Sequence, residues 1–229
     1  MFRSILLLML AFWGTTALAN ARDDATLFMS HFIDQKEWNK AHRAFAQNRD
    51  RLYRDTLLLQ GIDIMDMEHF RDMIPKSAAD EAVQQLKHHV ADVIIQSYGT
   101  ETLSQIADFF RTPTGEIMLA TARTNKLFKQ LHRQSPRGGP VEQMSAYLPI
   151  GELARYRVFT STPAGKVFVQ QTWAIRRALY YEIHEISHWP KLPLNRPYIV
   201  EIIKTDGILK FPNRVARQSL VRELSVTSP

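Results

Sequence analysis

The chain has 229 residues, of which 45% are hydrophobic, carries a formal net charge of +6 and contains no cysteine. Without cysteine it can form no disulfide, and thiol nucleophiles and thiolate metal ligands are both excluded. A chain of this length is long enough to bury one sizeable hydrophobic core or two smaller ones.

The first 21 residues have the features of a secretory signal peptide. Arg3 supplies a positive start, an apolar run follows from Ile5 to Trp13, and Ala17 to Ala19 and Ala19 to Ala21 are two candidate cleavage sequences. The apolar run is too short to span a bilayer comfortably. We expect residues 1–21 to be removed on export, with an uncleaved anchor as the alternative, and no later segment to cross a membrane.

Residues 22–76 are expected to form an N-terminal helical region. A polar segment from Asp23 to Gln60 has apolar residues at helical spacing, with a break near Asp34 to Glu37. The next stretch, from Gly61 to Pro75, is typical of a helical turn followed by a loop. A clear helical pattern then covers Ser77 to Tyr98.

Glycine and threonine residues mark the next helix boundaries. Gly99 is placed to end the preceding helix in a left-handed conformation. Either Thr100 or Thr102 is expected to cap the following helix. That helix would direct Leu103 and Phe110 inward.

A short signature occurs twice, fifty residues apart. Phe109 to Gly115 reads FFRTPTG, and Phe159 to Gly165 reads FTSTPAG. In each copy the threonine can cap a new helix, and the proline suits the first helical position while disfavouring helical geometry at the residue before it. The glycine permits close backbone approach. Each copy therefore predicts a corner at which one helix ends and another begins.

The repeated corner predicts an all-α fold. We expect residues 77–188 to form a pseudo-duplicated body of two related helix–corner–helix units, separated by a loop at Ser135 to Pro140. Residues 189–229 would form a less regular C-terminal extension. Within it, 198–211 fits either a short hairpin turning at Asp206-Gly207 or a helix opened by Pro197 and closed by Gly207, and we favour the helix. A final helix is predicted from Val215 to Leu224.

The stretch from about Val93 to Leu131, centred on Ile106 to Gly115, resembles an exported bacterial family known as domain of unknown function 2059. That family is marked by an aromatic pair, a Ser/Thr-Pro-x-Gly corner and a resumed apolar helix. The resemblance implies an export signal, an all-helical fold and a location in the periplasm or cell envelope. It implies no known activity, cofactor or catalytic residue, and it does not extend to the second corner or to the C-terminal part.

Basic residues point to an anionic partner. Their densest stretch contains Arg123, Lys126, Lys129, His132, Arg133 and Arg137. For an exported protein, a nucleic acid is not an expected partner, whereas an anionic envelope component or an unknown protein is. A solvated basic face that only aids solubility is the alternative interpretation.

One motif has the pattern of a zinc site. The run His184-Glu185-Ile186-Ser187-His188 matches H-E-x-x-H, in which two histidines on one helical face hold Zn²⁺ and the glutamate acts as base. Glu201 or Asp206 would supply the third ligand. Against this hypothesis, Pro190 ends any helix at or near the second histidine, and Arg177 lies on the same helical face.

The sequence thus leaves two functional hypotheses. The first is an exported, non-enzymatic binding or interaction protein of the envelope that needs no cofactor. The second is a zinc-dependent peptidase or amidase that uses His184 and His188 as metal ligands and Glu185 as general base.

Overall fold

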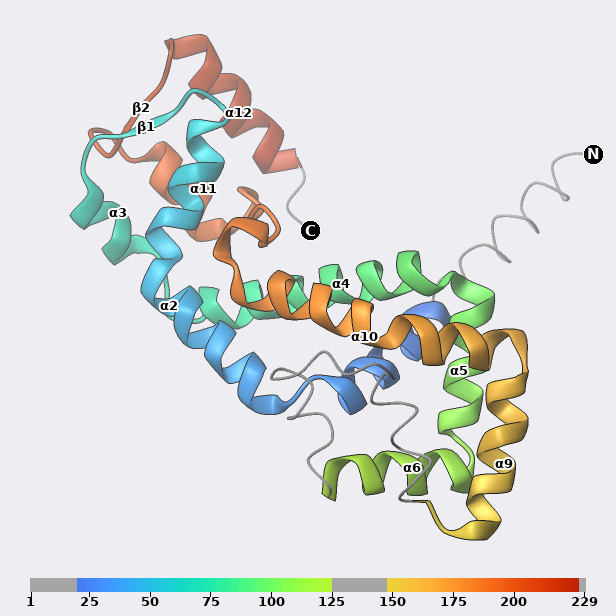
Figure 1. Ribbon diagram of the computed structural model, residues 1–229. Coiled ribbons are helices and arrows are strands. Elements are labelled where there is room, and N and C mark those ends of the chain that lie inside the picture. The colour runs from blue at the N-terminus through green and yellow to red at the C-terminus, as the bar shows by residue number, and fades with distance from the viewer. Residues whose placement is uncertain (1–19, 125–147, 227–229) are drawn as a thin grey trace, which may run out of the picture. The chain divides into compact units, whose positions relative to one another are not determined.

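The computed structural model describes residues 20–124 and 148–226. The fold is all-α, and the described residues contain one very small two-stranded sheet (Figure 1). No helix among the described residues is both long enough and apolar enough to cross a membrane.

The chain divides into two compact units, each built from two separate segments. Of the described residues, unit 1 contains 20–35, 88–124 and 148–182, and unit 2 contains 36–87 and 183–226. These units do not follow the regions 22–76, 77–188 and 189–229 expected from the sequence. The difference arises because each unit combines an early segment with a late one, and local sequence patterns do not report such pairings.

Unit 1 holds both signature corners. It contains the helical residues 20–32, the end of α4 (Ala78–Tyr98), α5 (Thr100–Phe110), α6 (Pro113–Thr124), α9 (Ile150–Ser161) and most of α10 (Pro163–His184). The expected break after the first helix is present, since residues 33–34 are not helical and α2 (Gln35–Leu58) begins directly after them.

The two corners have the capping geometry that the signature predicts. At the first, the Gly115 amide donates to Thr112 Oγ1 at 3.1 Å, and that hydroxyl donates to the Phe109 carbonyl at 2.7 Å. At the second, the Gly165 amide lies 3.0 Å from Thr162 Oγ1, which again donates at 2.7 Å to a phenylalanine carbonyl. Each threonine thus bonds to the end of one helix and the start of the next.

Both corner glycines lie against the backbone of the preceding helix. A Cβ atom on Gly115 would stand 2.7 Å from the Phe110 Cα, and one on Gly165 would stand 2.7 Å from the Thr160 Cα. The neighbouring phenylalanine carbonyls would be closer still. These contacts confirm the close approach expected from the sequence.

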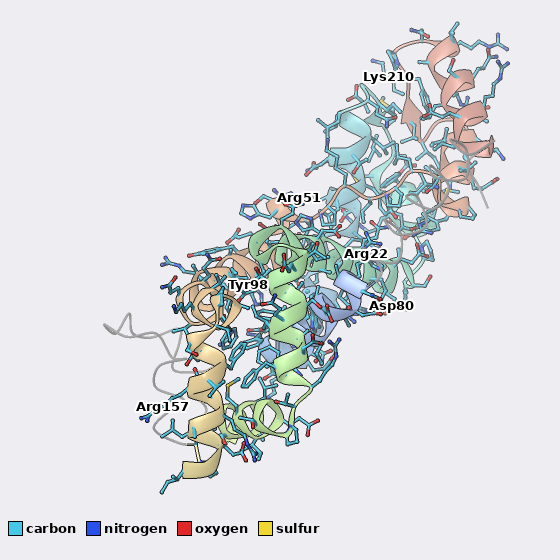
Figure 2. The ribbon with its side chains drawn as sticks, turned by 90° about the vertical axis from the view of Figure 1, so that its right-hand side faces the viewer. Arg22, Arg51, Asp80, Tyr98, Arg157 and Lys210 are labelled. Atoms are coloured by element: carbon cyan, nitrogen blue, oxygen red, sulfur yellow. The ribbon has the colours of Figure 1, made fainter. Side chains whose placement is uncertain are left out.

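The corner phenylalanines of the two copies stack on one another. The rings of Phe109 and Phe159 are parallel within 1°, with centroids 3.9 Å apart. Helices α5 and α9, which carry them, run side by side in both views (Figure 1 and Figure 2). Equivalent residues of the two copies therefore meet at the contact between the two helix–corner–helix units.

An aromatic core fills unit 1 behind this stack. Phe168 of α10 is fully buried and contacts the rings of Phe32, Phe110 and Phe159 at centroid distances of 5.4 to 6.2 Å. Beside this core, the hydroxyl of Tyr98 is 2.7 Å from Thr172 Oγ1. The buried residues of α10 include Phe168, Thr172, Ile175, Leu179 and Ile183, which recur at intervals of three and four and so form one inward stripe.

The buried hydroxyl of Tyr98 is expected to make the protein less stable at alkaline pH. Burial raises the pKa of its hydroxyl above the ordinary value, and the hydrogen bond with Thr172 offsets only part of that rise. A raised folded-state pKa contributes stability that is complete below the unfolded pKa, near 10, and is lost as the pH rises above it. We expect the free energy of unfolding to fall as the pH rises above about 10, and to fall less in Tyr98→Phe.

Denaturant unfolding at several pH values measures this effect. Tyr180→Phe serves as the control, since Tyr180 is exposed. Equal alkaline losses in the wild type and Tyr98→Phe would show that the buried hydroxyl does not contribute to the pH dependence.

Unit 2 contains the remaining elements. They are nearly all of α2, then β1 (Asp63–Ile64), α3 (Met67–Met73), the start of α4, the short 3-10 helix η2 (Ile186–His188), α11 (Pro197–Lys204), β2 (Leu209–Lys210) and α12 (Arg214–Val226). Phe45 of α2 stacks on Trp189 at 6.0 Å, and Tyr53 hydrogen-bonds to Tyr198 of α11 at 2.5 Å. Long-range aromatic pairs thus join the two segments of unit 2.

Residues 198–211 form a helix and then a strand. The favoured helix is confirmed as α11, which begins at Pro197. Gly207 follows with a φ of +86°, in the region that favours glycine. The alternative of a local hairpin turning at Asp206-Gly207 was wrong. The strand Leu209–Lys210 pairs instead with Asp63–Ile64, about 145 residues earlier in the chain.

Three smaller predictions also differ from the structure. Neither Thr100 nor Thr102 caps α5, because the N-cap residue is Gly99 and makes no side-chain capping bond. Gly99 has the expected positive φ, but its ψ of 151° is extended rather than left-handed helical. The C-terminal part is also more regular than expected, with α11 and α12 covering much of it. The predicted loop at residues 135–140 lies outside the described residues.

Candidate functional site

The H-E-x-x-H motif is not contained in one helix. Helix α10 ends at His184, Glu185 has extended backbone dihedrals of −94° and 104°, and His188 is the last residue of η2. The zinc hypothesis requires both histidines on one face of a continuous helix. That helical placement is absent here, because the helix ends four residues earlier than the motif needs.

The expected third ligands do not complete a metal site. Glu201 is an exposed residue of α11, and Asp206 forms an ion pair with Arg217, with Oδ1 and Nη1 2.6 Å apart. Across residues 20–124 and 148–226, no three His, Asp or Glu side chains are grouped so that they could hold a metal ion. Among the described residues, His184 and His188 therefore have no third ligand grouped with them, and zinc binding by this pair stays a prediction for metal analysis.

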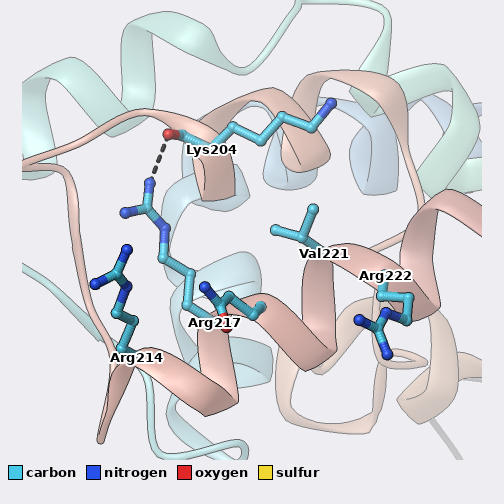
Figure 3. Close-up of a pocket in the computed structure, with 6 residues that line it drawn as sticks. Lys204, Arg214, Arg217, Val221 and Arg222 are labelled. Carbon is cyan, nitrogen blue, oxygen red and sulfur yellow. Dashed lines mark hydrogen bonds between the residues drawn. The ribbon is translucent and has the colours of Figure 1, made fainter.

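A different cluster of functional side chains lies in unit 2, on α11 and α12. An open hollow of about 410 Å³ is lined by Lys204 at the end of α11 and, from α12, by Arg214, Arg217, Gln218, Val221 and Arg222. We call this the cationic hollow. Figure 3 shows the Arg214 and Arg217 guanidinium groups at one end of the view, the Lys204 ammonium and Arg222 guanidinium at the other, and Val221 between them.

Arg217 is held in place by three hydrogen bonds to the protein. Its Nε donates to the Ile203 carbonyl at 3.0 Å, its Nη2 donates to the Lys204 carbonyl at 2.5 Å, and its Nη1 donates to Asp206. The first two bonds satisfy carbonyl groups at the C-terminal end of α11, where a positive charge is favoured. Phe211 lies 5.8 Å beneath the guanidinium and supports it further.

Positive charge dominates this part of the chain. Five basic residues and one acidic residue lie between Lys204 and Arg222. Lys204, Arg214 and Arg222 are exposed, whereas Arg217 is partly buried. Asp206 is the one carboxylate within this range and pairs with Arg217, while Glu201 and Glu223 lie just outside it. The hollow therefore attracts anions.

Comparison of the chain with models of protein families, with curated proteins and with solved structures found no match. What the cationic hollow binds therefore has to be inferred from the chemistry of its own side chains.

This site was not predicted from the sequence. The signal was present in the spacing of the α12 residues, since 214, 217, 218, 221 and 222 recur at intervals of three and four and so share one side of a helix. The prediction of an anionic partner rested instead on the denser basic stretch at 123–137. Most of that stretch lies outside the described residues, and no described side chain belongs to it.

Proposed function

We propose that this chain is an exported helical protein of the bacterial envelope that binds an anionic envelope component through the cationic hollow and catalyses no reaction there. The observation that carries the proposal is the convergence of four basic side chains on one open hollow of unit 2. The signal-like N-terminus and the resemblance of the first corner to an exported family support the location.

The side chains of the hollow suit binding better than catalysis. Those that line it supply positive charge, one amide and one apolar surface. A carboxylate, imidazole or hydroxyl that could act as general base or nucleophile is not among them. Near an anionic surface each Lys or Arg contributes about 1 kcal/mol to binding, so several acting together give measurable affinity at moderate salt.

Vesicle co-sedimentation tests the proposal. The full chain should bind phosphatidylcholine vesicles that contain phosphatidylglycerol more tightly than vesicles of phosphatidylcholine alone, and the difference should shrink as salt is added. The double variant Arg214→Gln/Arg222→Gln should lose roughly 2 kcal/mol of binding free energy, or more than about tenfold in affinity.

A matched variant separates the hollow from net charge. Arg51→Gln/Arg54→Gln removes the same charge from α2, also in unit 2, where both arginines lie beside Asp55. We expect that variant to bind nearly as the wild type does. Since all variants share the same N-terminal segment, their differences report the substituted side chains. Equal losses in both double variants, or no preference for anionic vesicles, would contradict the proposal. One tightly held zinc per chain, lost in His188→Ala, would favour the hydrolase hypothesis.

A further inference from the structure

We infer that the cationic hollow is a binding site for a phosphomonoester group, organised by Arg217 and Arg214, rather than a diffuse basic surface. This inference rests on the proposed function and names the chemistry that its site recognises. It depends on how the guanidinium groups are held and on where the charges lie.

Arg217 presents its remaining hydrogen-bond donors in a fixed direction. A guanidinium has five N–H donors, and three of those of Arg217 are used by Ile203, Asp206 and Lys204. Two N–H groups remain for a ligand. Because the side chain is already immobilised, a ligand that binds it loses little further side-chain entropy. A diffuse basic surface lacks such a preorganised donor.

The carboxylate at this end does not fill the hollow. Asp206 is 90% exposed, its Oδ1 lies 2.6 Å from Nη1 of Arg217, and it is not among the residues that line the hollow. Arg214 carries a second guanidinium at the same end of the view as that of Arg217 (Figure 3). Two guanidinium groups can therefore be offered to one ligand, with Asp206 offsetting one of their charges.

A phosphomonoester matches these donors in charge and geometry. It carries nearly two negative charges at pH 7 and three terminal oxygens, so that two planar guanidinium forks can each engage a pair of oxygens. A carboxylate has one charge and two oxygens, and it satisfies only one fork. A phosphodiester likewise carries a single charge. At the opposite end of the hollow, Lys204 and Arg222 add positive charge that can attract a second anionic group of the same ligand.

The size and openness of the hollow suit a group carried on a larger molecule. About 410 Å³ is more than a phosphate needs and lies within the range of ordinary ligand sites. Val221, between the two charged ends, offers an apolar contact to whatever bears the phosphate. The same chemistry is supplied by a lipid headgroup and by a soluble phosphorylated compound.

Charge-conserving substitutions test the inference. Arg214→Lys keeps the positive charge but loses the planar fork, and Arg214 makes none of the bonds that hold the end of α11. We expect Arg214→Lys to weaken binding to vesicles containing phosphatidic acid by about tenfold, and to weaken binding to phosphatidylglycerol vesicles of equal surface charge much less. Arg51→Lys is the matched control and should change neither. Arg217→Lys should weaken phosphatidic acid binding too, and a thermal melt will show whether α11 is disturbed.

The outcomes separate this inference from the proposed function. If the wild type binds both lipids equally and Arg214→Lys has no effect, the phosphomonoester site is overturned while anionic binding stands. If the wild type binds neither lipid, both are overturned. Competition by millimolar glycerol phosphate would support recognition of the soluble group, and selective binding of phosphatidic acid without such competition would support recognition of the lipid headgroup.

Discussion

Gly165→Ala is expected to destabilise unit 1 by roughly 3 kcal/mol. The new Cβ would stand 2.7 Å from the Thr160 Cα and closer still to the Phe159 carbonyl oxygen. Both are backbone atoms of the helix before the corner, so relief requires the two helices to separate. Helix propensity alone would make the alanine variant more stable, because it favours alanine over glycine by up to about 1 kcal/mol. The steric contact is expected to outweigh this gain, so that the free energy of unfolding falls. Gly115→Ala at the first corner should behave in the same way.

Urea unfolding measures the effect, with Gly151→Ala as the control. Gly151 lies in α9, one of the helices that meet at the second corner, and a Cβ there has nothing within 4 Å. We expect that variant to be neutral or more stable by up to about 1 kcal/mol. If Gly165→Ala were as stable as the wild type, the close packing at the corner would not exist as described.

The second large effect is expected at Phe168. Its ring is fully buried and contacts aromatic rings from three other helical segments of unit 1. Phe168→Ala leaves a cavity among aromatic rings that belong to other helices. Because those helices hold the rings in place, the rings cannot move in to fill the cavity. The expected loss is about 3–5 kcal/mol, which is a large part of the stability of a domain of this size.

Val158→Ala is the control for Phe168→Ala. Val158 lies in α9, and its side chain is 68% exposed. That variant should change the free energy of unfolding by less than about 0.5 kcal/mol. A loss at Phe168 no larger than the loss at Val158 would show that the aromatic cluster is not the core of unit 1.

The corners are the part of the fold that local sequence predicted best. Thr, Pro and Gly each act on their immediate neighbours: the threonine caps, the proline prevents the preceding residue from continuing the helix, and the glycine removes a Cβ. All three effects are present at both corners. Local chemistry did not predict which residues the corners would bring together. The stacking of Phe109 on Phe159 depends on how two helices fifty residues apart pack.

The zinc motif illustrates the limit of pattern matching. The spacing of His184 and His188 is meaningful only if the chain between them is helical, and α10 ends at the first of them. Pro190 predicted a helix end at or near His188, whereas α10 ends four residues earlier, at His184. Trp189 packs on Phe45 and donates to the Ile183 carbonyl at 3.2 Å, which holds the chain in its non-helical course.

The cationic hollow shows the opposite case, in which a recognisable pattern was overlooked. The spacing from Arg214 to Arg222 indicates one helical face, but the prediction of an anionic partner was based on the denser basic stretch at 123–137. Even with α12 recognised, the role of Arg217 could not have been foreseen. Its hydrogen bonds go to carbonyl groups at the end of α11, which are exposed only because that helix stops at Lys204.

The sequence by itself determined the helical class, most helix positions and the two corners, because hydrophobic spacing, capping and backbone restriction act within a few residues. The tertiary structure alone decided the pairings between distant segments. Asp24 is buried against Arg111, 87 residues later, and Asp63–Ile64 finds its strand partner at Leu209–Lys210. Such pairings follow from which surfaces bury the most apolar area together, and that quantity is a property of the assembled helices rather than of any one stretch of chain.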